Sequence, residues 1–331
     1  MQTKEWSIGK LLAMAGSYWQ ACTLHAAVKL EVFTLLGEET LTCDDLEKRI
    51  GAEPRGVGML LNALTALGLL AKSGDNYTNT ASSKSFLCKD SDHYLGYIIM
   101  HHHNLVESWA RLDKSVLSGK PAKQEDEMPG ADALEHFLMG MFNMASVLAP
   151  LIVEEVDLSG RRHLLDLGGG PGTYAIHFCL KNPDLEATVF DLHPTRSFAE
   201  QTIEKFGLSD RINFVDGDYL RDSFPEHYDV VWMSHILHQE GAKECQAIIN
   251  KAVASLDSAG EVLVHEFFLE DTMDAPLFPA LFSLNMLVNT KKGQSYPERQ
   301  IRDMLVKAGL KNVTHFPFRG PHDSSILAGT L

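Results

Sequence analysis

Residues 164–172 read LLDLGGGPG, and this stretch decides the fold. The apolar run predicts a buried strand, and Gly168, Gly170 and Gly172 predict a tight turn before a helix that starts at Thr173. Glycine adopts positive φ angles that other residues avoid, and its missing side chain lets a ligand approach the backbone. The stretch therefore predicts the first strand and glycine turn of a Rossmann-like domain that binds an adenosine-type cofactor.

Acidic residues around this turn narrow the choice of cofactor. Asp191 ends the next predicted strand, where a carboxylate can accept hydrogen bonds from ribose hydroxyls, and Asp218 ends the third, where it can meet an adenine amino group. Asp166, just before the glycines, suits a positively charged ligand better than a diphosphate. The glycine spacing differs from the GxGxxG of dinucleotide sites, so a cofactor with a sulfonium and an amino-acid tail is favoured over a nicotinamide dinucleotide.

The second half of the chain alternates predicted strands and helices. Near-continuous apolar strands joined by helices indicate a mostly parallel sheet covered on both faces, which is an α/β fold. Two last strands, 313–318 and 325–331, predict an antiparallel hairpin at its edge. The other expected strands are 163–167, 187–190, 212–215, 230–233 and 261–267, and the expected helices are 173–181, 197–206 and 242–256.

The first third predicts a helical domain of winged-helix order. A helix is expected over 19–36 and ends at Gly37. Thr42 and Asp45 form a capping box that opens a short helix, and Pro54 begins another. Residues 69–80 then predict a hairpin that turns at 74–76.

Winged-helix order raises the alternative of a DNA-binding, ligand-sensing regulator. The helix from Pro54 argues against this alternative because Arg55 is its one charged residue, whereas a helix that reads a groove needs polar and basic groups. The formal net charge of −15 also disfavours nucleic acid as a partner. A role in a core or a subunit interface is the expectation for this helix.

The middle of the chain is expected to connect the two domains. A helix over 94–116 carries His101, His102 and His103, which point about 100° apart and cannot all bind one ion, so no metal site is expected. Residues 119–132 predict a surface connector, and a helix over 133–148 is expected to end before Pro150. The expected parts are therefore a helical, winged-helix-like domain over 1–105, connecting helices over 106–150 and a cofactor-binding domain over 151–331.

Cysteine spacing and hydropathy predict where the protein resides. The five cysteines are scattered without CxxC spacing, which favours a reduced chain. Neither a signal sequence nor a long uninterrupted apolar run is evident, so we expect a cytoplasmic protein that does not bind membranes.

Four motifs in the second half also resemble one known family. LLDLGGGPG, VFDLHP, FVDGDYL and the stretch from Trp232 to Phe267 are similar in order and spacing to the S-adenosylmethionine-dependent O-methyltransferases of the caffeic acid and acetylserotonin type. The resemblance covers nearly the whole chain. It implies a homodimer formed through the N-terminal domain and methyl transfer to a hydroxyl of a small aromatic or polyketide-like acceptor. Methylation at carbon or nitrogen on the same scaffold remains an alternative.

The resemblance also assigns the site. His238 falls where the family places its catalytic base, with His235 as a weaker candidate. The acids that usually orient this histidine are replaced here by Gln239 and Ser295, which leaves Glu240 and Glu298 as candidates for that task. The implied cofactor-binding residues, together with Asp166, are Gly168, Gly169, Gly170, Asp191, Leu192, Asp218, Tyr219 and Ser234.

Overall fold

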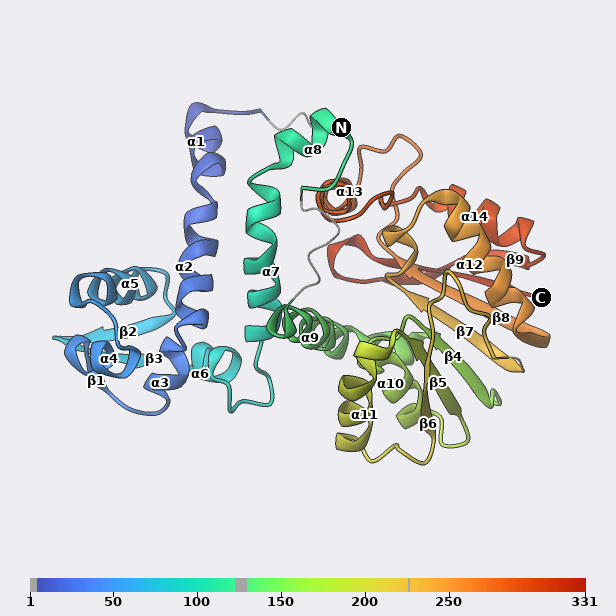
Figure 1. Ribbon diagram of the computed structural model, residues 1–331, viewed down its shortest axis with the longest axis horizontal. Coiled ribbons are helices and arrows are strands. Elements are labelled where there is room, and N and C mark those ends of the chain that lie inside the picture. The colour runs from blue at the N-terminus through green and yellow to red at the C-terminus, as the bar shows by residue number, and fades with distance from the viewer. Residues whose placement is uncertain (1–4, 123–129, 226) are drawn as a thin grey trace. The chain divides into compact units, whose positions relative to one another are not determined.

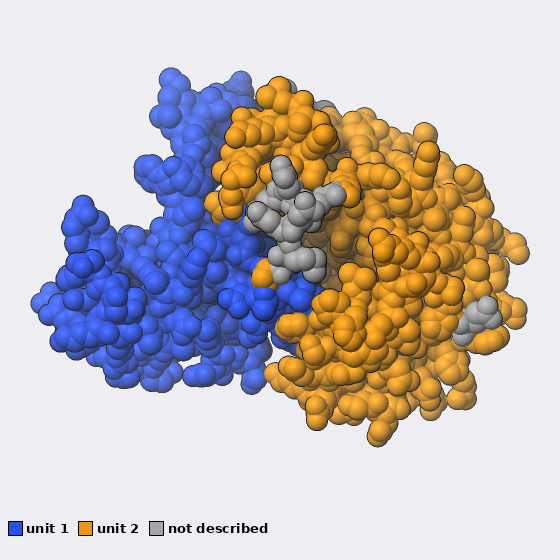
Figure 2. All heavy atoms as spheres, in the orientation of Figure 1, with its two compact units in different colours: residues 1–105, 131–143 blue, residues 106–130, 144–331 orange. Residues whose placement is uncertain are grey.

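The computed structural model describes residues 5–122, 130–225 and 227–331 and divides into two compact units. Unit 1 comprises Met1–Leu105 and Ala131–Asn143, and unit 2 comprises Val106–Gly130 and Met144–Leu331 (Figure 2). The segment 106–150, expected as a connecting region, is thus divided between the two units. Most of the expected surface connector, residues 123–129, lies outside the described residues.

Unit 1 contains short helices around a small sheet of strand order β1-β3-β2. The predicted capping box is confirmed: the Thr42 side chain accepts from the Asp45 backbone and the Asp45 carboxylate accepts from the Thr42 backbone. The predicted hairpin is confirmed as the antiparallel pair β2–β3. The elements are α1 (Ile8–Gly16), α2 (Tyr18–Lys29), α3 (Val32–Leu36), β1 (Leu41–Thr42), α4 (Cys43–Ile50), α5 (Pro54–Ala66), β2 (Leu70–Ser73), β3 (Asn76–Asn79), α6 (Ala81–Leu87) and the start of α7 (Gly96–Trp109).

Three predicted helix boundaries are wrong. The helix expected over 19–36 is interrupted at Glu31, whose left-handed φ of 56° cannot continue a right-handed helix. The helix expected over 94–116 stops at Trp109 and resumes as α8 (Leu112–Ser118). Pro150 lies inside α9 (Ala131–Glu155) rather than after its end.

Burial explains why α9 continues through a proline. Proline removes one backbone hydrogen bond, but the neighbouring Ala149 and Ile152 are fully buried, so packing offsets the loss. By length and composition α9 would pass as a membrane span among the described residues, a test that core helices also pass. Its C-terminal turns belong to the core of unit 2.

Unit 2 is built on a seven-stranded sheet of order β6-β5-β4-β7-β8-β10-β9. The first five strands in this order run parallel, and β10 pairs antiparallel with both β8 and β9, which confirms the predicted edge hairpin. The strands are β4 (His163–Leu167), β5 (Glu186–Asp191), β6 (Ile212–Asp216), β7 (Tyr228–Ser234), β8 (Leu256–Glu266), β9 (Lys311–Arg319) and β10 (Ser325–Thr330).

Helices cover both faces of this sheet, as Figure 1 shows. Side chains alternate between two cores: Val230 and Trp232 of β7 enter the core that includes α10 (Thr173–Lys181) and α11 (Arg196–Lys205). Val231 and Met233 enter the other core, beside α12 (Ala242–Ala254) and α14 (Glu298–Lys307). Both faces of the central strand β7 are therefore buried, as expected for a parallel sheet covered by helices.

The register of β7 against β8 positions the site. Ser234, the last residue of β7, pairs with His265, the penultimate residue of β8. The segment after β7 therefore starts beside the end of β8. In open α/β sheets, ligands bind at the carboxyl ends of the strands.

Candidate active site

The glycine turn after β4 has the backbone that its sequence predicted. Gly168, Gly170 and Gly172 all have positive φ, at 66°, 56° and 78°. A Cβ on Gly168 would lie 2.6 Å from the Ile236 side chain, whereas a Cβ on Gly170 would meet nothing within 4 Å. The turn is thus packed against protein at its start and open at Gly170, where a ligand can approach the backbone.

Asp166 is buried beneath the turn with unused hydrogen-bonding capacity. Its Oδ2 accepts from the Ala175 amide at 3.2 Å, but its Oδ1 has no hydrogen-bond partner among the described residues. Burial raises the pKa of this carboxyl to about 7. A cationic amino group would both pair with Oδ1 and favour the ionised form, so Asp166 fits a positively charged ligand.

Asp191 links the end of β5 to the turn. Its Oδ2 accepts from the Gly170 amide at 2.8 Å and its Oδ1 from the Leu192 amide at 2.6 Å. Burial raises the pKa of Asp191, and its backbone hydrogen bonds act in the opposite direction. Asp191, expected at the ribose, and the exposed Leu192, expected to contact the cofactor, therefore lie next to the glycine turn.

The residues expected at the adenine form a polar group after β6. Asp218 Oδ1 accepts from the Leu220 amide at 2.8 Å, and the Tyr219 hydroxyl donates to Glu240 at 3.3 Å. Ser234 Oγ lies 2.9 Å from Nδ1 of His265. Ser234 is therefore held within the protein, and its expected contact with the cofactor stays a prediction.

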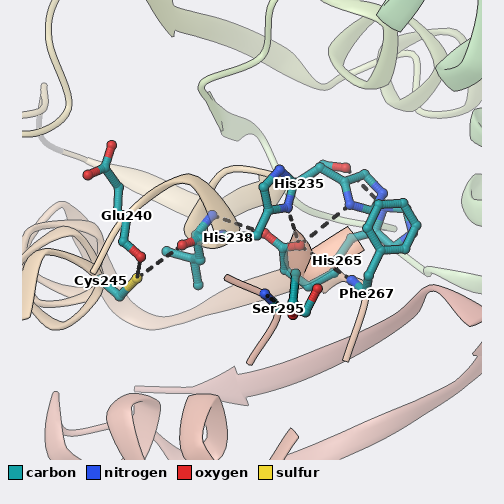
Figure 3. A network of polar contacts seen from close by, with 11 residues as sticks. His235, His238, Glu240, Cys245, His265, Phe267 and Ser295 are labelled. Atoms are coloured by element: carbon teal, nitrogen blue, oxygen red, sulfur yellow. Dashed lines mark hydrogen bonds and ion pairs between the residues drawn. The ribbon is translucent and has the colours of Figure 1, made fainter. Parts of the chain in front are cut away.

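His238 forms a buried pair with Glu266, the last residue of β8. Its Nδ1 lies 2.8 Å from Oε2 of Glu266, and both side chains are less than a tenth exposed (Figure 3). The other carboxylate oxygen accepts from the backbone amides of Leu237 at 3.0 Å and His238 at 3.3 Å. Burial alone would raise the pKa of Glu266, but the neighbouring imidazoles of His238 and His235 hold it well below its usual range. The carboxylate is thus ionised, fixed and directed at one nitrogen of the imidazole.

Aromatic rings surround His238. The His238 ring lies 4.8 Å from Phe282 of α13 (Leu277–Asn289) in an edge-to-face arrangement. Phe267 and Phe278 pack against Phe282 with centroids 5.0 and 5.8 Å apart, and His322 stacks on Phe278 at 4.1 Å. We call Phe267, Phe278, Phe282 and His322 the aromatic wall. Such rings favour flat, apolar ligands.

The acid that orients His238 is therefore neither of those expected. Glu240 accepts from Tyr219, and Glu298 bonds to Arg302 and His315. Sequence reasoning missed Glu266 because it lies 28 positions from His238. The sequence does contain a signal: Glu266 is a charged residue near the end of the apolar run EVLVHEF. Adjacent parallel strands end at the same edge of a sheet, so an acid at the end of this strand can lie close to a histidine that follows the neighbouring strand.

His101, His102 and His103 do not form a metal-binding group among the described residues. Burial lowers the pKa of His101 to about 4, and its ring packs on Phe137 at 5.4 Å. His103 lies 3.3 Å from Lys29. Within unit 1 these histidines make packing and surface contacts.

Comparisons with known proteins identify the family to which the chain is similar. Residues 123–311 match the model of the O-methyltransferase domain, and residues 12–89 match that of the O-methyltransferase dimerisation domain. A 3-hydroxy-5-methyl-1-naphthoate 3-O-methyltransferase of Streptomyces sahachiroi is 31% identical over 96% of this chain and 94% of its own. An O-methyltransferase family protein of Burkholderia thailandensis is 30% identical, with a TM-score of 0.88 over 98% of both chains. Human N-acetylserotonin methyltransferase in complex with SAM is 25% identical, with a TM-score of 0.86 over 100% of this chain and 99% of that one.

The chain belongs to the O-methyltransferase family. It is an S-adenosylmethionine-dependent O-methyltransferase whose class I fold is preceded by a dimerisation domain. The open turn at Gly170 and the unsatisfied Oδ1 of Asp166 fit this cofactor, which carries a sulfonium and an amino-acid tail.

Proposed function

We propose that this enzyme methylates a hydroxyl on a small aromatic or polyketide-like acceptor, with His238 as general base. The observation that carries the proposal is the buried 2.8 Å contact between His238 Nδ1 and Glu266 Oε2, beside the aromatic wall. S-adenosylmethionine, when bound, supplies an electrophilic methyl group with a good leaving group. The chain must then align the acceptor and remove its proton.

Glu266 determines which nitrogen of His238 accepts the proton of the acceptor hydroxyl. The ionised carboxylate accepts the proton of Nδ1–H, so the neutral imidazole keeps its free lone pair on Nε2. A phenol has a pKa near 10 and needs a base near neutral pH. Nε2 takes the phenol proton as the oxygen attacks the methyl group, and Glu266 stabilises the imidazolium that results.

The other polar residues serve cofactor binding in this proposal. Asp166 pairs with the amino group, and the Asp191 carboxylate accepts hydrogen bonds from the ribose hydroxyls with Leu192 beside it. Asp218 and Tyr219 border the adenine. Gly168 to Gly170 bring the backbone close to the cofactor. Support comes from the clustering of these residues at the carboxyl ends of β4, β5 and β6.

Unit 1 is proposed to form the homodimer. Two observations support this. Residues 12–89 match the dimerisation domain, and α1 and α2 carry exposed apolar side chains. Among them, Ile8, Leu12 and Trp19 are 80%, 68% and 67% exposed. The five free cysteines support a cytoplasmic location. Light scattering on a size-exclusion column tests the dimer; a monomeric wild-type chain would contradict it.

The test of the activity uses hydroxynaphthoates, including 3-hydroxy-5-methyl-1-naphthoate, with methyl-labelled S-adenosylmethionine. Label should appear in a product whose mass rises by one methyl group on oxygen. His238→Ala should lose turnover but keep cofactor affinity by calorimetry. Full turnover in His238→Ala, or a product methylated on carbon or nitrogen, would contradict the proposal.

A further inference from the structure

His235 is a histidine that the proposed methyl transfer does not use. Its Nδ1 lies 3.5 Å from Oε2 of Glu266, the same oxygen that contacts His238, and makes no hydrogen bond among the described residues. The side chain is about one-fifth exposed.

The backbone places this ring toward Glu266. His235 follows β7 directly and has a φ of 57°, in the left-handed region, while its amide donates to the His265 carbonyl at 2.9 Å. Non-glycine residues in this region are strained and cluster at functional sites. Phe267 stacks on the ring at 4.2 Å and fixes its plane (Figure 3).

Two imidazoles and one carboxylate thus converge. One ligand atom from each of His235, His238 and Glu266 lies within 4.8 Å of the other two. Tetrahedral zinc, with bonds of about 2.0 to 2.2 Å, holds its ligand atoms about 3.3 Å apart. The contacts of 2.8 and 3.5 Å to Glu266 Oε2 bracket that value, whereas the third separation, between the two rings, is within 4.8 Å, so binding requires the two imidazoles to move toward each other.

The surroundings also resemble those of a metal site. Glu266 Oε1 accepts the amides of Leu237 and His238, which leaves Oε2 to face the two rings. Metal-binding carboxylates are usually held by such outer hydrogen bonds. Two histidines and one carboxylate suit zinc and its neighbours in the first transition row, with a fourth position left for water.

We propose that His235, His238 and Glu266 form a binding site for a divalent transition-metal ion of the zinc class. Binding uses the Nδ1 lone pair of His238, so the ring proton moves to Nε2 and no net proton is released. Nε2 then has no lone pair to accept the acceptor's proton. Occupation of the site therefore inhibits methyl transfer, and this second part rests on His238 being the base.

Cobalt(II) added to the full-length enzyme, without cofactor or acceptor, tests binding independently of activity. Tetrahedral coordination should give visible absorption bands that saturate at one ion per chain, and zinc should displace them. Loss of a residue that only hydrogen-bonds to a metal ligand weakens metal binding by roughly 10- to 100-fold. His235 is proposed to bind the metal directly, so His235→Gln should weaken cobalt binding by more than that. Bands that persist unchanged in both His235→Gln and Glu266→Gln, or that never form, would overturn the site.

A matched variant tests whether other histidines bind the cobalt ion. The triple change of His101, His102 and His103 to Gln should leave the cobalt bands unchanged, and loss of the bands in that variant alone would overturn the assignment. Calorimetric affinity for S-adenosylmethionine checks that each variant is folded. Zinc should inhibit wild-type turnover at the concentration that saturates the cobalt site. Binding without inhibition would keep the site but contradict the role of His238 as base.

Discussion

Replacing Glu266 with Gln tests how the buried pair works. The side chain keeps its shape and its Oε1 can still accept from Leu237 and His238, but an amide NH₂ now faces Nδ1 of His238 in place of Oε2, 2.8 Å away. Because two donors cannot face each other, the imidazole adopts the tautomer with its proton on Nε2. That tautomer cannot accept the acceptor's proton.

The expected loss follows from the size of general-base catalysis. A positioned base contributes about 10² to 10⁴ in rate, so kcat of Glu266→Gln should fall by about that factor. Each factor of ten corresponds to about 1.36 kcal/mol, which makes the loss about 3 to 5 kcal/mol of transition-state stabilisation. Affinity for S-adenosylmethionine should not change, because Glu266 lies on β8 and not at the glycine turn.

Single-turnover methyl transfer with labelled cofactor measures this loss. Glu298→Gln is the matched control, because Glu298 bonds to Arg302 and His315 and should give wild-type rates. Since Glu266 is proposed to act through His238, the double variant with His238→Ala should be no slower than His238→Ala alone. Wild-type kcat in Glu266→Gln would refute the reasoning, and so would additive losses in the double variant.

Three further predictions concern the cofactor and the acceptor. Because burial raises the pKa of Asp166 to about 7, calorimetric affinity for S-adenosylmethionine should increase from about pH 6 to pH 8 as the carboxyl ionises; a flat profile would contradict the amino-group contact. Gly170→Ala should abolish cofactor binding, while Gly51→Ala, also at positive φ in open space, should cost only the backbone strain of about 1 to 2 kcal/mol in a thermal melt; equal cofactor affinity in both would refute the close approach. Phe282→Ala should raise the KM of a hydroxynaphthoate and leave cofactor affinity unchanged; an unchanged KM would remove Phe282 from the acceptor site.

Local patterns in the sequence were sufficient for most elements of the fold. The apolar run from 164 to 167 and the helix after Gly172 were predicted correctly, because buried parallel strands and glycine turns have strong local signatures. The capping box at Thr42 was predicted for the same reason. Helix interruptions were not: Glu31 breaks a helix with no glycine or proline, and Pro150 fails to break one, because packing outweighs local preference at both places.

The candidate site also contains one part that the sequence predicts and one part that it does not. The positions of Gly168, Asp166 and Asp191 near one another follow from strand ends that the sequence shows directly. The partner of His238 does not follow, because the sequence separates it from Glu266 by 28 positions and offers Glu240 much closer. Only the register that pairs Ser234 with His265 brings Glu266 beneath the segment after β7.

The sequence by itself determined the class of fold and the glycine turn, and it singled out His238 as the proposed base, since each depends on a short continuous stretch. The tertiary structure decided which carboxylate fixes that histidine and which second histidine shares it. These contacts depend on how two parallel strands align, and hydrophobic periodicity shows that a strand is buried without showing its register against a neighbour.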